Sequence, residues 1–189
     1  MNNINFKKYF LRTLVVALSI SALIGIFIFL VGDFGETEIR LLLTTLVIGG
    51  YSLAGLCSST IQNRNELRAF SLMGILVSII GFVITILALW EIIDFNDIWR
   101  LMLVFIILSV AIAHISLLLQ IRPKTDSIKY SLIGTIFFIS IVAFMLIKAI
   151  LNGFNESDTF FRLLGVFSIL NVLGTIATPI MDRTIKKTE

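Results

Sequence analysis

The sequence has very few of the residues that build covalent, metal or redox sites. It contains one cysteine, two prolines and one histidine in 189 residues. Cys57 has no second cysteine to pair with, so an intrachain disulfide is excluded, and one thiol cannot form a thiolate metal site. His114 likewise has no second imidazole for metal or haem ligation. We therefore expect no metal and no cofactor.

Charge is absent from six long stretches of the chain, and these stretches indicate its architecture. They cover residues 13–32, 41–63, 69–90, 101–121, 130–147 and 163–181, and each holds 18 to 23 residues. Hydrophobic residues make up 58% of the sequence, and the mean hydropathy is +1.03. A helix of about 20 apolar residues crosses a bilayer, and the stretches lack the alternation of barrel strands. The sequence predicts an all-α integral membrane protein with six transmembrane helices, near residues 11–31, 39–61, 69–92, 98–121, 128–151 and 160–181.

The expected helices have no interior proline, and none has a charged residue in its middle. Pro123 lies in an expected loop, and Pro179 lies in the last turn of the sixth helix, so we expect no broken helix of the kind common in transporters. No Asp, Glu, Lys or Arg falls in the middle of a helix, although ion-coupled transporters and pumps usually need one. No nucleotide-binding, zinc or nucleophile motif occurs, so we expect no intrinsic catalysis.

Three arginines mark a repeated unit. Arg40, Arg100 and Arg162 each follow a short acidic segment and open a long apolar stretch, and they are 60 and 62 residues apart. This period corresponds to two helices and their connection. We expect three tandem, repeat-related helical hairpins, near residues 8–61, 68–121 and 128–182, within a single transmembrane domain covering 1–189. In length and topology the layout resembles the small bacterial HdeD-like membrane proteins, although the proline- and glycine-rich hairpin motif expected of that group is missing.

Each of these arginines has an acidic residue three or four positions before it. The expected pairs are Glu36 with Arg40, Asp97 with Arg100, and Asp158 with Arg162. An acidic side chain in a first helical turn complements the helix dipole and can pair with a base one turn later. The expected N-caps are Thr37, Asn96 and Ser157. We interpret these groups as helix caps and interfacial anchors; the alternative is a charged vestibule ringed by the arginines.

Basic residues are distributed unequally between the two ends of the expected bundle. Eleven of the fifteen lie at the termini and in the second and fourth connections, and four lie near the other connections. The positive-inside rule then places both termini in the cytoplasm, with the bacterial inner membrane as our preferred location. The net charge of +3 reflects this topology, so the expected partner is the lipid bilayer and not nucleic acid.

Small residues follow one face of the third expected helix. Ser71, Gly74, Ser78 and Gly81 recur at steps of three or four residues and share a narrow face. Small side chains let membrane helices approach closely, so we expect this face to pack against another helix.

A stripe of hydrogen-bonding groups runs along the fourth and sixth expected helices. Counted from the repeat arginine, matched positions carry Ser109, Ser116, Asn171, Thr175 and Thr178. We interpret the stripe as interhelical hydrogen bonding. The alternative is a shared polar seam that lines a narrow path.

His114 is deep in the fourth expected helix, about 21 Å below Arg100 at 1.5 Å per residue. An ionisable residue inside a membrane is a candidate functional site, and histidine titrates near neutral pH. The side chain points about 140° away from the Ser109 stripe, and no second histidine exists. We favour a neutral imidazole bonded to Tyr51 or Asn171; the alternative is a pH-sensitive group.

These features favour an accessory or scaffolding subunit of a membrane complex, which packs on partners through its small-residue faces. The partner is either a second copy of the chain or another membrane protein. The alternative function is a passive channel or facilitator for a small solute, acting as an oligomer and lined by the polar seam. A third hypothesis is pH sensing through His114.

Overall fold

The computed structural model describes residues 6–31, 35–92, 97–123 and 125–186, and within these ranges it contains helices and no strand. The helices are α1 (Phe6–Val31), α2 (Glu36–Ser59), the short 3-10 turn η1 (Asn65–Leu67), α3 (Arg68–Leu89), α4 (Ile98–Leu118), α5 (Asp126–Leu151) and α6 (Asp158–Lys186). Six of them are long and apolar enough to cross a membrane, judged by length and composition. The predicted all-α fold with six helices of spanning length is therefore confirmed, and it is compatible with a multi-pass membrane protein.

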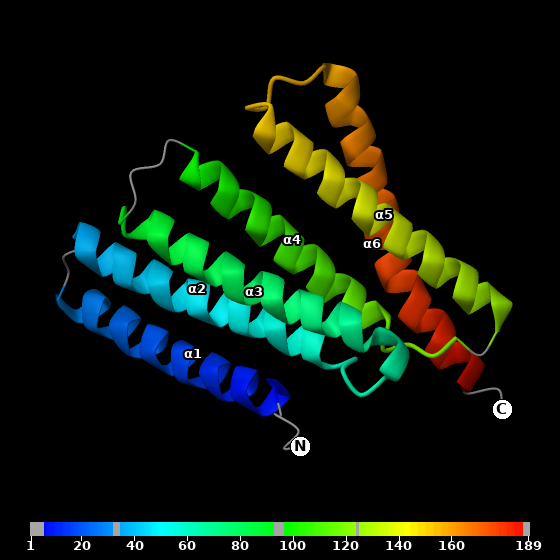
Figure 1. The fold of residues 1–189 in the computed structure, drawn as a ribbon, viewed down its shortest axis with the longest axis horizontal. Helices are drawn as coiled ribbons and strands as arrows, with labels where there is room; N and C mark the ends of the chain where they lie inside the picture. Colours follow the sequence, from blue (N-terminus) through cyan, green and yellow to red (C-terminus); the bar gives the residue numbers. More distant parts are fainter. Residues whose placement is uncertain (1–5, 32–34, 93–96, 124, 187–189) are drawn as a thin grey trace.

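The long helices run alternately in opposite directions, so α1 begins and α6 ends at the same end of the bundle (Figure 1). We call this end the terminal end and the opposite one the far end. Helix α2 packs on α1, α3 and α4; α4 also packs on α3 and α5; and α6 packs mainly on α5. Helix α5 lies beside α4, and at the far end a Cβ on Gly153, just after α5, would lie 3.9 Å from the Arg100 side chain of α4. Helix α6 crosses α5 (Figure 1). The chain thus consists of a four-helix body and an appended hairpin.

The small face of α3 lies inside the four-helix body. Ser71, Gly74, Ser78 and Gly81 are all buried, as the close-packing interpretation requires. A Cβ on Gly74 would lie 2.5 Å from the Ser58 hydroxyl of α2 and 2.7 Å from an Ile112 methyl of α4. This face therefore holds α2, α3 and α4 together, and it is not available to another protein.

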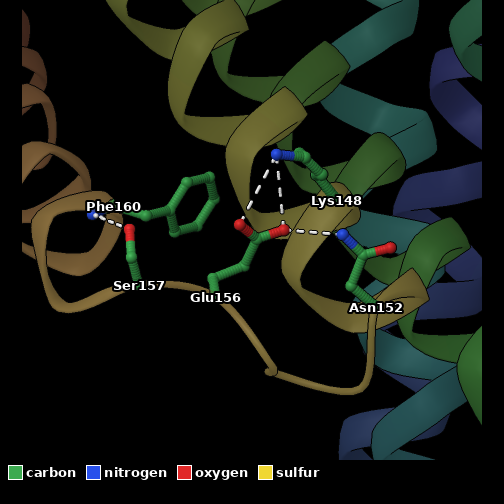
Figure 2. A network of polar contacts seen from close by, with 5 residues as sticks. All are labelled: Lys148, Asn152, Glu156, Ser157 and Phe160. Carbon is green, nitrogen blue, oxygen red and sulfur yellow. Dashed lines mark hydrogen bonds and ion pairs between the residues drawn. The ribbon is translucent and has the colours of Figure 1, made fainter.

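Of the three expected helix caps, one is wrong, one is present and one lies outside the described residues. Helix α2 begins after Gly35, so Thr37 lies inside its first turn and does not cap it. Ser157 does precede α6, and its hydroxyl accepts a hydrogen bond from the Phe160 N–H at 3.4 Å (Figure 2). The third expected cap, Asn96, lies outside the described residues.

Helices α3 and α5 end in the same way at the far end. The backbone turns into the left-handed region at Glu91 after α3 (φ 49°) and at Gly153 after α5 (φ 64°). The next amide in each case returns to a carbonyl five residues earlier, at 3.2 Å and 2.7 Å respectively. This is the Schellman ending, which glycine adopts without steric cost and glutamate does not.

Candidate functional site

An open cavity of about 880 Å³ lies at the terminal end, between α4, α6 and the connection from α4 to α5. We call it the α4–α6 pocket. Its lining residues are His114, Leu117, Leu118, Gln120, Ile121, Arg122, Pro123, Thr175, Pro179 and Asp182. The volume is that of a ligand pocket, and a few polar groups converge on an otherwise apolar wall. This combination makes it the candidate site of the protein.

The inner end of the pocket is formed by a hydrogen bond between α4 and α6. His114 Nε2 and Thr175 Oγ1 are 3.0 Å apart, and the same hydroxyl lies 2.8 Å from the Asn171 carbonyl. Because a hydroxyl has one proton, donation to the carbonyl leaves its oxygen to accept from His114, which places the imidazole proton on Nε2. The expected partners of His114 were wrong. Tyr51 lies on α2 and bonds Thr85 of α3 at 2.9 Å instead.

Pro179 lies in the wall of the pocket and well inside α6, contrary to the expectation that it would lie in the last turn. Helix α6 continues to Lys186, almost two turns beyond it. Proline has no amide proton, so the Thr175 carbonyl, four residues earlier, has no helical hydrogen bond. Thr175 therefore presents a carbonyl without its helical partner and a hydroxyl bonded to His114 at the same place.

Two charged residues flank the pocket. Asp182 of α6 is 8% exposed, whereas Arg122 is exposed in the connection that follows α4. Gln120 turns partly away, because its side-chain nitrogen donates to Oγ1 of Thr60, the residue that follows α2, at 3.0 Å. Gln120 and Asp182 each lie twenty residues after a repeat arginine. That matched pair of polar positions is the sequence signal that could have indicated the pocket.

The five residues of the predicted polar stripe do not line one common path. Ser109 and Ser116 are 2% and 0% exposed and lie on the face of α4 that carries Ile112, toward α3. Neither serine hydroxyl has a hydrogen-bond partner within the described parts of the chain. Thr178 is instead 2.8 Å from Ser131 of α5. Of the five, only Thr175 lines the pocket, because the matched faces of α4 and α6 meet different neighbours.

The acidic partner predicted for Arg40 was wrong. Arg40 extends across to the end of α3, where it donates to the Glu91 carboxylate at 2.9 Å and to the Leu89 carbonyl at 3.3 Å. The carboxyl-terminal end of a helix carries partial negative charge. At the end of α3, Arg40 therefore gains a favourable interaction with this partial charge as well as with the Glu91 carboxylate, whereas Glu36 provides a carboxylate alone.

Of the other two expected ion pairs, one forms and the other does not. Arg100 and Asp97 are joined at 2.9 Å, as their spacing indicates. Asp158 and Arg162 are both exposed, and no ion pair joins them in the described part of α6. Such a pair at a solvent-exposed helix start contributes little free energy.

A polar network that the sequence did not reveal closes the α5–α6 hairpin. Figure 2 shows the Glu156 carboxylate facing both Lys148 of α5 and Asn152, the residue that follows α5. The Asn152 amide donates to Glu156 at 2.6 Å, and the Lys148 ammonium is 3.4 Å from the same carboxylate. Lys148 also lies 5.2 Å from the centre of the Phe160 ring of α6. The network fixes the connection between the two helices at the far end.

Comparison of the chain with protein-family models, with curated proteins and with solved structures finds no match.

Proposed function

We propose that this chain is an accessory subunit of a membrane complex, without catalysis of its own, and that it holds its partner through α6. The observation that supports this proposal is the side-chain amide of Asn171. Its oxygen receives only a long contact of 3.4 Å from Thr175, and its nitrogen has no acceptor within the described residues. Asn171 is half-buried.

The position of Asn171 makes the lack of an acceptor costly. It lies thirteen residues after the start of α6 and fifteen before its end, near the middle of the helix. At that depth water is not available to the amide, and an unsatisfied polar group costs several kcal/mol. A polar group from a neighbouring membrane helix removes that cost, and hydrogen bonds of this kind join helices within bilayers.

Helix α6, like α1, also has room for a partner. Among its described side chains only Thr178 and Asp182 are buried, and it packs mainly on α5. The role that we expected for the small face of α3 is transferred to α6 in this proposal, because that face is occupied within the chain.

The test is purification from native membranes in gentle detergent, followed by mass analysis of the intact complex. A stoichiometric partner that is retained by the wild-type chain and lost from Asn171→Leu supports the proposal. The matched control is Ser140→Ala, which removes an exposed hydroxyl at similar depth in α5 that already donates to the Ile136 carbonyl at 2.9 Å. Equal retention in Asn171→Leu and the wild type contradicts the role of Asn171. A complex of this chain alone favours the channel or facilitator instead.

We further propose that both termini are cytoplasmic, that the membrane is the bacterial inner membrane, and that the three hairpins are related by a repeat. The charge distribution supports the orientation, since eleven of fifteen basic residues belong to the terminal end. The left-handed helix endings support the repeat, since Glu91 and Gly153 are 62 residues apart, as are Arg100 and Arg162.

A further inference from the structure

We propose that the inner end of the α4–α6 pocket binds the hydroxyl group of a neutral alcohol or phenol that is dissolved in the membrane, and that the Thr175 carbonyl accepts its hydrogen bond. This inference does not depend on the accessory role proposed above. It rests on a carbonyl that Pro179 leaves without its helical donor, on the depth of that carbonyl and on the apolar wall beside it.

The Thr175 carbonyl is an acceptor for which α6 supplies no donor. In a regular helix it would accept from the amide of residue 179, but proline has no amide proton. No side chain among the described residues donates to it; the nearby Thr178 hydroxyl bonds the Gly174 carbonyl instead, at 2.8 Å. A helical carbonyl points along the helix toward the fourth residue after it, and both Thr175 and Pro179 line the pocket. The carbonyl therefore lies in the pocket wall.

The other polar groups at the inner end also offer acceptors and have no donor to spare. The Thr175 hydroxyl donates to the Asn171 carbonyl at 2.8 Å, and His114 Nε2 donates to that hydroxyl at 3.0 Å. With its proton on Nε2, the imidazole keeps a lone pair on Nδ1, which no donor within the described parts of the chain bonds. A ligand at this end must therefore donate. A ketone, an ester or an ether offers only lone pairs.

The depth of the carbonyl favours a neutral donor over a charged one. Helix α4 has 21 residues and is about 31 Å long, close to the thickness of the hydrocarbon core. His114 lies four residues, or about 6 Å, before its end, and the hydrogen bond holds Thr175 at the same depth. Inside the hydrocarbon an unsatisfied carbonyl is costly, and so is an ammonium group. Asp182 already has an interaction within the chain, so it is assigned no role in binding.

The wall beside the carbonyl is suited to an apolar body. Leu117, Leu118, Ile121 and Pro179 line it, and the cavity is open. A cavity of about 150 Å³ holds a benzene ring, so the volume of about 880 Å³ has room for a ring and part of an aliphatic chain. A hydroxyl on such a body satisfies the carbonyl and covers the leucines at the same time, which a water molecule does not.

The test compares the binding of para-octylphenol and para-octylanisole to the full chain in detergent. The two compounds share one apolar body, but the anisole carries a methyl ether in place of the hydroxyl. Equilibrium dialysis at a fixed detergent concentration, with protein-free micelles as the reference, corrects for partition into the detergent. We expect the phenol to bind about fivefold more tightly, the typical effect of one hydrogen bond between neutral groups.

The two prolines of the chain provide a matched pair of variants, because both line the pocket. Pro179→Ala restores an amide proton for the Thr175 carbonyl and keeps the rest of the wall, so the preference for the phenol should disappear while anisole binding changes little. Alanine also favours the helix, so this loss would not reflect unfolding. Pro123→Ala makes the same change in the connection after α4 and leaves the Thr175 carbonyl free, so the preference should remain.

A second pair of variants locates the bound compound. Leu117→Trp fills the pocket and should weaken the binding of both compounds. Val110→Trp makes a similar change on the same face of α4, two turns toward the far end, and should weaken neither.

Three results would overturn the proposal. The first is equal binding of the phenol and the anisole to the wild-type chain. The second is an equal loss of the preference in Pro179→Ala and Pro123→Ala, which would show a change in the shape of the pocket and no role for the Thr175 carbonyl. The third is binding of unsubstituted phenol as tight as that of para-octylphenol, which would assign the pocket to a water-soluble compound.

Discussion

The ring of Tyr51 in α2 lies directly against the backbone of Gly81 in α3. A Cβ on Gly81 would come within 2.7 Å of the ring, and the ring cannot move away easily, because Tyr51 is 8% exposed and its hydroxyl bonds Thr85 at 2.9 Å. Glycine is therefore required here by the close approach of two helices and not by an unusual backbone angle.

Gly81→Ala should lower the free energy of unfolding by about 1 to 3 kcal/mol, the usual cost of overpacking a core. The control is Gly134→Ala in α5, where nothing lies within 4 Å of the added methyl group. That variant should be neutral or more stable, since alanine favours a helix over glycine by about 1 kcal/mol. Thermal unfolding in detergent, followed by circular dichroism, measures both. Equal destabilisation by the two changes would contradict the packing described for α3.

Glu91 has two opposing effects on the stability of the fold at the end of α3, a favourable ion pair and an unfavourable backbone conformation. Its carboxylate pairs with Arg40, but its side chain is 67% exposed, so Glu91→Gln should lower stability by less than about 1 kcal/mol, and less still at high salt. Glu91→Gly loses the same ion pair and also relieves the left-handed backbone, which costs a residue with a Cβ about 1 to 2 kcal/mol. The glycine variant should therefore be more stable than the glutamine variant. The reverse order would contradict a cost of the left-handed backbone at Glu91, because both variants lose the ion pair equally.

The proposed orientation can be measured by labelling single cysteines with a membrane-impermeant maleimide. Cys57 is half-buried and is first replaced by alanine. Thr125→Cys then reports on the terminal end and Asn155→Cys on the far end, since both positions are exposed. We expect Asn155→Cys to react in intact cells and Thr125→Cys to react only after the membrane is opened. The opposite pattern would place both termini outside the cytoplasm.

The number of helices and their approximate positions followed from the sequence, because a bilayer requires long uncharged stretches and the charges mark where they stop. The close packing of the α3 face followed as well, because Gly74 and Gly81 recur at helical spacing, but the sequence assigned this face to a partner protein and not to α2 and α4 of the same chain. Helix ends were less predictable. Pro179 indicated an end, yet α6 continues to Lys186, since a single proline removes one hydrogen bond without stopping the residues that follow.

Contacts between distant parts of the chain could not be predicted in the same way. Helical periodicity gives the direction of a side chain but not the identity of the helix that lies there. Arg40 was therefore assigned to nearby Glu36, although Glu91, fifty-one residues away in the sequence, lies beside it. For the same reason, Ser116 and Thr178 occupy matched positions but lie in two separate interfaces. The α4–α6 pocket arises from such contacts, which explains why only its matched polar residues were visible beforehand.

The hydrogen bond between His114 and Thr175 connects the four-helix body to α6, so its removal should loosen the appended hairpin. His114→Leu and Thr175→Val each remove one partner, and the bond contributes only if their effects on stability are not additive. We expect a coupling free energy of about 0.6 kcal/mol, with an upper value near 1.7 kcal/mol, as found for hydrogen bonds between membrane helices. A double-mutant cycle of unfolding in detergent measures this coupling, and hydrogen exchange along α6 reports whether residues near Thr175 open more often. A coupling of zero together with unchanged exchange would show that α6 is held by its packing on α5 alone, and that the inner end of the pocket is not a structural link between the two parts of the protein.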